Sequence, residues 1–157
     1  MIKRSIKIND FGFTLIEVLV AISIIGFITI ASMVIFKQVR MSSRDASRVA
    51  NIATIKKALA MYLNDSPNGY PSSNGECLST SVDVGSALIS ANTITAVPVD
   101  PMWPTTAPSV VENGYATSTS QNFCYYYFSN TSNAYKISYY LESNSKFGNA
   151  GINTLTF

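Results

Sequence analysis

The sequence contains no histidine, and charged residues make up only 13% of its 157 residues. Histidine is the commonest general base in enzymes and the usual base of a Ser-His-Asp triad. Its absence therefore removes the most frequent kind of hydrolytic active site. The two cysteines cannot complete a zinc site without histidine ligands. We expect a protein that is not an enzyme, with no cofactor and no metal site.

Proline is also absent between residues 13 and 66, so nothing there interrupts a helix. Residues 13–36 are apolar or small except for one charge, and a run of 24 residues is long enough to span a bilayer as a helix. Beyond it, apolar residues recur at spacings of three and four, which predicts that the helix continues with one apolar stripe. The stripe consists of Val49, Ile52, Ile55, Leu59 and Leu63, with Arg48, Lys56 and Lys57 expected on other faces. We predict one continuous helix of about 50 residues, roughly 75 Å long.

The single charge in the apolar run is Glu17, close to its beginning. A carboxylate inside a membrane-length segment is unfavourable by about 2.5 kcal/mol or more at the centre, and less near an end. Glu17 is therefore expected to have a partner.

Charge is distributed unevenly along the chain. Residues 1–63 carry nine Lys or Arg against three acids, a balance of +6, whereas residues 64–157 carry two against six, a balance of −4. We expect the acidic half to form the exposed domain, which is a poor electrostatic trap for nucleic acid. This half also holds Cys77 and Cys124. Outside the cytoplasm they are expected to form a disulfide; the alternative is two buried free thiols.

The acidic half has the pattern of a small α+β domain. A short helix is predicted at 84–91, followed by an extended segment and rigid turn at Val97-Pro98-Val99-Asp100-Pro101. Strands are predicted at 123–128 and 134–142, joined by a turn at 130–133, with a third strand at 152–157. One antiparallel sheet, buried on one face, would then cover the apolar stripe of the long helix.

With these residues in view, the chain resembles the type IV pilin and type II secretion pseudopilin family. The resemblance rests on Gly12 followed by Phe13-Thr14-Leu15-Ile16-Glu17, after a short basic leader and before an apolar helix. It implies that a prepilin peptidase cuts after Gly12 and that the new terminal residue, Phe13, is N-methylated. It also implies that Glu17 pairs with the amine of Phe13 on another subunit during assembly.

The resemblance further implies a domain organisation and a set of partners. It predicts a leader at 1–12, a transmembrane and filament-core helix at 13–36, an amphipathic continuation at 37–64 and an extracytoplasmic globular domain at 65–157. The implied partners are other copies of the chain in a helical filament, the prepilin peptidase, and an assembly platform with its ATPases. The precursor would be a single-pass protein of the inner membrane, and the assembled filament would lie at the cell surface.

Three functions agree with these features. The first is a structural subunit of a type IV pilus-like filament that serves adhesion, motility or DNA uptake. The second is a pseudopilin of a type II secretion system. Calcium prefers several carboxylate or carbonyl oxygens, and residues 143–157 contain no Asp or Glu, which argues against the calcium-bound form of that family. The third, from a different class, is a membrane-anchored binding module that never assembles.

Overall fold

The structure is a computed structural model that describes residues 12–81, 83–107, 110–112, 115–117 and 122–157. Residues 1–11 of the predicted leader lie outside the described residues. The chain divides into two compact units, of which one ends at Val39 and the other begins at Arg40. Each unit is described by itself.

A single helix, α1, runs over Leu15–Asp65 and comprises 51 residues, which confirms the predicted length and continuity. It ends just before Ser66-Pro67, because proline cannot continue a helix. In the first unit the large apolar side chains of α1 lie in the open on all sides; Phe27 and Ile30, for example, are 76% and 71% exposed. A helix that is apolar all round needs an apolar environment, either lipid or other helices.

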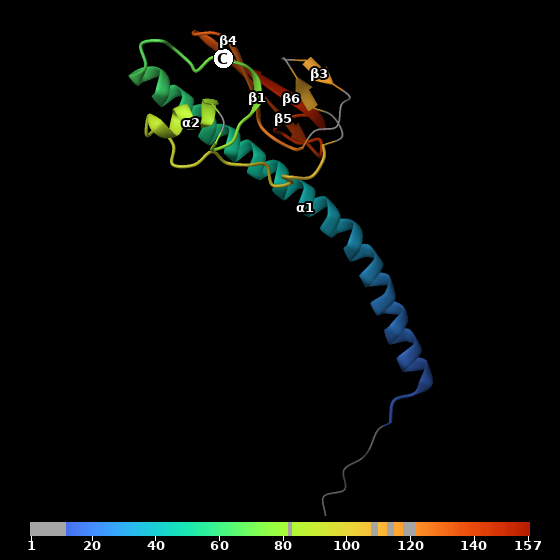
Figure 1. The fold of residues 1–157 in the computed structure, drawn as a ribbon. Helices are drawn as coiled ribbons and strands as arrows, with labels where there is room; N and C mark the ends of the chain where they lie inside the picture. The colour runs from blue at the N-terminus through green and yellow to red at the C-terminus, as the bar shows by residue number, and fades with distance from the viewer. Residues whose placement is uncertain (1–11, 82, 108–109, 113–114, 118–121) are drawn as a thin grey trace, which may run out of the picture. The chain divides into compact units, whose positions relative to one another are not determined.

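The second unit is an α+β domain, as predicted (Figure 1). A four-stranded antiparallel sheet has the order β1-β4-β5-β6. Its strands are β1 (Ser73–Cys77), β4 (Tyr126–Thr131), β5 (Ala134–Leu141) and β6 (Gly151–Thr156). A short helix, α2 (Asp83–Ser90), follows β1. The strands β2 (Val110–Glu112) and β3 (Tyr115–Thr117) form a separate two-stranded sheet.

The core of this unit lies between the C-terminal part of α1 and the sheet. Ile55 and Leu59 of α1 are fully buried against Tyr127 of β4 and Ile137 of β5. The alternation predicted for 134–142 places its apolar face here, since Tyr135, Ile137, Tyr139 and Leu141 are all buried.

Three predictions about this unit were wrong in detail. Arg48 is fully buried rather than on another face, because it precedes Ile52 by four residues and shares its side of the helix. Leu63 is 40% exposed, so the covered stripe ends one turn earlier than predicted. The strand predicted at 123–128 begins only at Tyr126, because Phe123 turns aside to pack against Ala107 in a second small cluster.

Candidate functional site

The beginning of α1 is organised around Thr14 and Glu17. The backbone N–H and the hydroxyl of Thr14 both donate to Oε2 of Glu17, at 2.8 Å each. In return, the backbone N–H of Glu17 donates to the Thr14 hydroxyl at 3.3 Å. These reciprocal bonds form a capping box, which satisfies backbone donors that a helix start leaves without partners. Within this chain, the partner of Glu17 is thus Thr14. The Thr-x-x-Glu spacing before an apolar run was the sequence signal for this cap, and the sequence reasoning did not use it.

The capping box occupies only one of the two carboxylate oxygens of Glu17. Oε1 has no hydrogen-bond partner among the described residues. Glu17 is one of the residues that line a shallow groove of about 360 Å³ along one side of α1, together with Ile16, Val20, Ala21 and Ile24. Next to it, Phe13 is 88% exposed, and no atom lies within 4 Å of a Cβ placed on Gly12. The structure therefore leaves both Gly12 and Phe13 accessible beside a carboxylate that retains one open acceptor.

In the rest of the apolar run, the side-chain hydroxyl groups form hydrogen bonds within the helix itself. The hydroxyls of Ser23, Thr29 and Ser32 each donate to the backbone carbonyl four residues earlier, at 2.8 Å. In lipid, polar groups must find partners inside the segment itself. Among the described residues, α1 alone is long and apolar enough to cross a membrane, and none of its most apolar window is buried. This part of α1 is thus suited to lipid or to a helix bundle.

A second cluster of functional groups lies inside the domain, around the buried guanidinium of Arg48. Arg48 donates from Nε and Nη2 to the carboxylate of Asp100, at 2.8 and 3.1 Å, and from Nη1 to Asp45 and Glu142, at 2.8 and 2.7 Å. Asp45 in turn accepts from the backbone N–H groups of Glu142 and Ser143, both at 3.0 Å. In the described part of the chain, no buried side-chain N or O atom lacks a partner. We call Asp45, Arg48, Asp100 and Glu142 the buried charge cluster.

The cluster keeps its groups charged. Burial by itself lowers the pKa of Arg48, but the hydrogen bonds to Asp100 and Glu142 more than offset it, so this pKa lies above its ordinary value. The hydrogen bond from Arg44 holds the pKa of Glu142 below its ordinary value, although partial burial opposes it. A buried charge with all its partners in place is evidence for a fixed geometry more than for added stability.

The position of the buried charge cluster explains what it does. It joins α1 to the turn that contains Asp100 and to the end of β5 at Glu142. These partners lie 52 and 94 residues from Arg48 in the sequence. The sequence reasoning missed the cluster, although the i, i+3 pair of Asp45 and Arg48 on the stripe face was a usable signal.

The two cysteines are joined in the structure. Cys77 at the end of β1 and Cys124 just before β4 form a disulfide, with their Cα atoms 5.5 Å apart. Next to it, the backbone N–H of Leu78 donates to the carbonyl of Tyr125 at 2.8 Å, so the bridge extends the pairing of β1 with β4. These cysteines belong to the second unit, whereas Gly12, Phe13 and Glu17 belong to the first.

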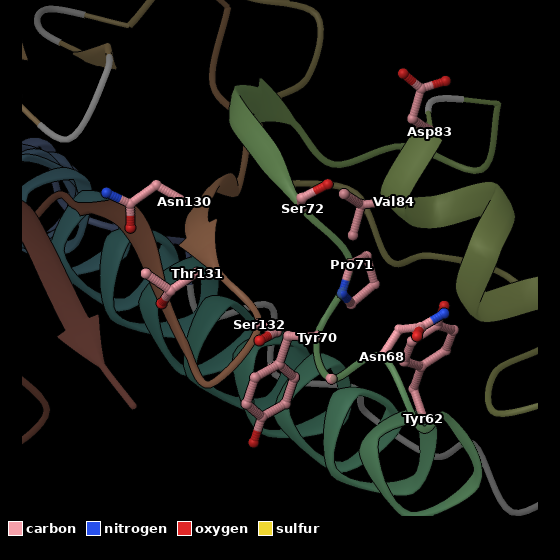
Figure 2. Close-up of a pocket in the computed structure, with 11 residues that line it drawn as sticks. Tyr62, Asn68, Tyr70, Pro71, Ser72, Asp83, Val84, Asn130, Thr131 and Ser132 are labelled. Atoms are coloured by element: carbon pink, nitrogen blue, oxygen red, sulfur yellow. The ribbon is translucent and has the colours of Figure 1, made fainter.

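A cleft of about 400 Å³ lies where loop 68–72, the β4–β5 turn and the start of α2 meet. Its walls include Tyr62, Tyr70, Asp83 and Asn130 (Figure 2). In Figure 2 the Asp83 carboxylate and the Asn130 amide point in different directions rather than toward a common point. Within the described ranges, no group of three His, Cys, Asp or Glu side chains could hold a metal ion. The cleft therefore has no chemistry that assigns it a ligand.

Comparison with known proteins gives one match. The family model described as the prokaryotic N-terminal methylation motif matches residues 8–33. No curated protein and no solved structure matches the chain. The matched residues include Gly12, Phe13 and Glu17, the residues that the structure leaves accessible at the start of α1. The chain thus carries the prokaryotic N-terminal methylation motif, the hallmark of type IV pilins and pseudopilins.

Proposed function

We propose that this chain is a prepilin, the precursor of a structural subunit of a type IV pilus-like surface filament. The observation that carries the proposal is the methylation motif at the start of a helix whose apolar N-terminal part is exposed, with Glu17 both capping that helix and keeping Oε1 open. The motif points to a structural protein rather than an enzyme.

The proposed sequence of events follows from the chemistry of the N-terminus. Hydrolysis of the Gly12–Phe13 peptide bond adds water across it and leaves a carboxylate on Gly12 and an amine on Phe13. Methylation of that amine retains its positive charge. Inside an apolar helix bundle, a lone cation and a lone carboxylate are each unfavourable. Pairing the Phe13 amine of an entering subunit with Oε1 of Glu17 on a neighbour offsets both, and fixes the axial register.

The proposal also gives the chain an orientation and a location. The leader would stay in the cytoplasm, α1 would cross the inner membrane, and the acidic domain with its disulfide would lie outside, where disulfides persist. Assembly would require the prepilin peptidase, an assembly platform and its ATPases. The balance of −4 over residues 64–157 makes direct binding of DNA by this subunit unfavourable.

The test uses two substitutions that separate the charge of Glu17 from its capping bond. Glu17→Gln retains an oxygen that can accept from Thr14 but has no charge, whereas Thr14→Ala removes the capping hydroxyl but retains the charge. We expect Glu17→Gln to abolish surface filaments while cleavage after Gly12 continues, as read by mass spectrometry of the N-terminus. Thr14→Ala should still assemble, because a lost cap costs only about 1 kcal/mol.

The alternatives give different results in the same cells. A pseudopilin would show loss of secreted proteins without any visible filament, and a non-assembling membrane-anchored module would be unaffected by Glu17→Gln. Wild-type numbers of filaments in the Glu17→Gln strain would contradict the proposed pairing. An uncut chain that retains its leader in a strain with active peptidase would contradict the proposed family role.

A further inference from the structure

The strand β6 forms one edge of the four-stranded sheet. It pairs with β5 over six residue pairs, from Leu141–Gly151 to Lys136–Thr156, without a register shift. In the described part of the chain no strand pairs with its other side. None of its six residues is buried, and Thr154 and Thr156 are exposed. The outer side of β6 is therefore an open sheet edge.

The pairing register identifies the residues that form this edge. Tyr135 and Phe157 exchange two backbone hydrogen bonds, both of 3.0 Å. In an antiparallel pair such hydrogen-bonded positions alternate with positions whose backbone groups point away. Phe157, Leu155 and Asn153 thus bond to β5, whereas Ile152, Thr154 and Thr156 direct their N–H and C=O groups outward. We call these outward groups of Ile152, Thr154 and Thr156 the β6 edge.

The opposite edge of the same sheet, formed by β1, has features that hinder pairing with another strand. β1 carries a register shift between Ser73 and Glu76 and a glycine at φ +114° at position 75. Bulges and charged residues are the usual means by which edges avoid pairing with other chains. β6 has regular register and contains no charged residue and no proline. The irregular β1 edge thus disfavours pairing with another strand, whereas the regular β6 edge permits it.

The chain itself contains an element suited to this edge. The β2–β3 hairpin pairs only with itself among the described residues, through three residue pairs that start at Val110–Thr117. A two-stranded hairpin is marginally stable in water and gains from adding to a larger sheet. The outward N–H and C=O groups of an edge strand are spaced to form hydrogen bonds with the backbone of another extended strand.

On this basis we propose that the β6 edge binds a strand of a second copy of this chain, contributed by its β2–β3 hairpin. The inference rests on the proposed filament function, because assembly brings copies together at high local concentration. One surface meets a different surface of the next copy, so the contact is heterologous and repeats along a helical filament. It would connect the domains of neighbouring subunits in addition to the contacts between their N-terminal helices.

Backbone hydrogen exchange tests this contact directly. The measurement compares filaments with the full chain as a monomer in detergent micelles. The amides of Ile152, Thr154 and Thr156 should exchange quickly in the monomer and about tenfold more slowly in the filament, as expected for a gained hydrogen bond. Equal exchange in intact filaments would overturn the inference and leave the filament function standing. Protection already present in the monomer would also overturn it, because the chain's own residues would then cover the edge. Absence of any filament would remove the proposed function and this inference together.

A matched pair of variants at Thr156 supplies the second test. Thr156→Pro removes an outward N–H but no bond to β5, and proline is tolerated on edge strands in that position. Thr156→Val retains the N–H and the branched shape. Thr156 is preferred to Thr154, whose hydroxyl bonds Ser138 at 2.8 Å. We expect Thr156→Pro to retain the melting temperature of the monomer but to lower the yield and heat resistance of filaments, and Thr156→Val to match the wild type in both. Filaments of Thr156→Pro that are as abundant and heat-resistant as the wild type would refute the contact.

Discussion

At the scale of single residues, Glu17 and Arg48 represent two ways of placing a charge in an apolar setting. Glu17 lies at the start of a helix, where backbone N–H groups favour a carboxylate, and it keeps one oxygen open. Arg48 is fully buried, and all of its carboxylate partners belong to the same subunit. Glu17 therefore keeps an oxygen available for a contact outside the chain, whereas Arg48 fixes the domain internally.

A prediction at this scale concerns the removal of the Arg48 guanidinium. Arg48→Met should lower the free energy of unfolding by about 3–5 kcal/mol, because the carboxylates of Asp45 and Asp100 would remain buried without their counter-charge. Arg44→Met is the matched control: Arg44 is 28% exposed, and its pair with Glu142 should contribute at most about 1 kcal/mol. Chemical denaturation of the full chain in detergent measures both. Equal losses for the two variants would show that the buried charge cluster has no special role.

At the scale of elements, loop 66–72 is held against the β4–β5 turn. Tyr70 donates its backbone N–H to the carbonyl of Ser132 at 2.8 Å, and the hydroxyl of Tyr127 donates to the carbonyl of Pro71 at 2.8 Å. Gly69 adopts φ +83° within this contact, and a Cβ there would lie 2.2 Å from the Ser132 oxygen. The loop that leaves α1 thus depends on a glycine at this position.

We therefore predict opposite effects for alanine at two glycines. Gly69→Ala should lower the melting temperature of the domain and cost more than about 1 kcal/mol, since alanine disfavours positive φ and would collide with the turn. Gly26→Ala should leave the melting temperature unchanged or raise it, because Gly26 lies inside α1 with open space around it and alanine is the better helix former. Differential scanning calorimetry of the two variants in the same detergent gives the comparison. A melting temperature for Gly69→Ala equal to that of the wild type would show that loop 66–72 does not depend on a glycine at position 69.

At the scale of the whole molecule, the two units differ in what stabilises them. In the described part of the first unit, residues 12–39, the apolar side chains are exposed and form no core, whereas the second unit has a core, a buried charge cluster and a disulfide. The disulfide connects β1 to the start of β4 and closes a segment with a sequence separation of 47 residues. The segment so enclosed contains α2 and the β2–β3 hairpin. α2 is also held by Val84 and Leu88, which are buried in the main core, whereas β2 and β3 pair only with each other among the described residues.

Reduction should accordingly destabilise the second unit. In the chain-entropy model a closed loop of this length contributes about 4 kcal/mol. We expect the denaturation midpoint of the wild type to fall on addition of reductant. The double variant Cys77→Ala with Cys124→Ala should start at the lower midpoint and not respond to reductant. A wild-type midpoint that reductant leaves in place, with the thiols shown to be free, would argue that the bridge contributes little.

The sequence by itself determined what depends on neighbours in the chain. The long helix, its apolar run and the alternation of β5 are local patterns, so spacing alone predicted them. The motif from Gly12 to Glu17 is also local, and its resemblance to a known family identified it. Tertiary structure decided the rest. Ser73–Cys77 has no strand pattern and becomes β1 only because β4 offers it a partner. Arg48 forms ion pairs with Asp100 and Glu142, which lie 52 and 94 positions away in the sequence, only because tertiary packing brings them to the same side of α1. A burial environment is set by contacts distant in the sequence, and for that reason spacing along the helix could not reveal which charges would be enclosed.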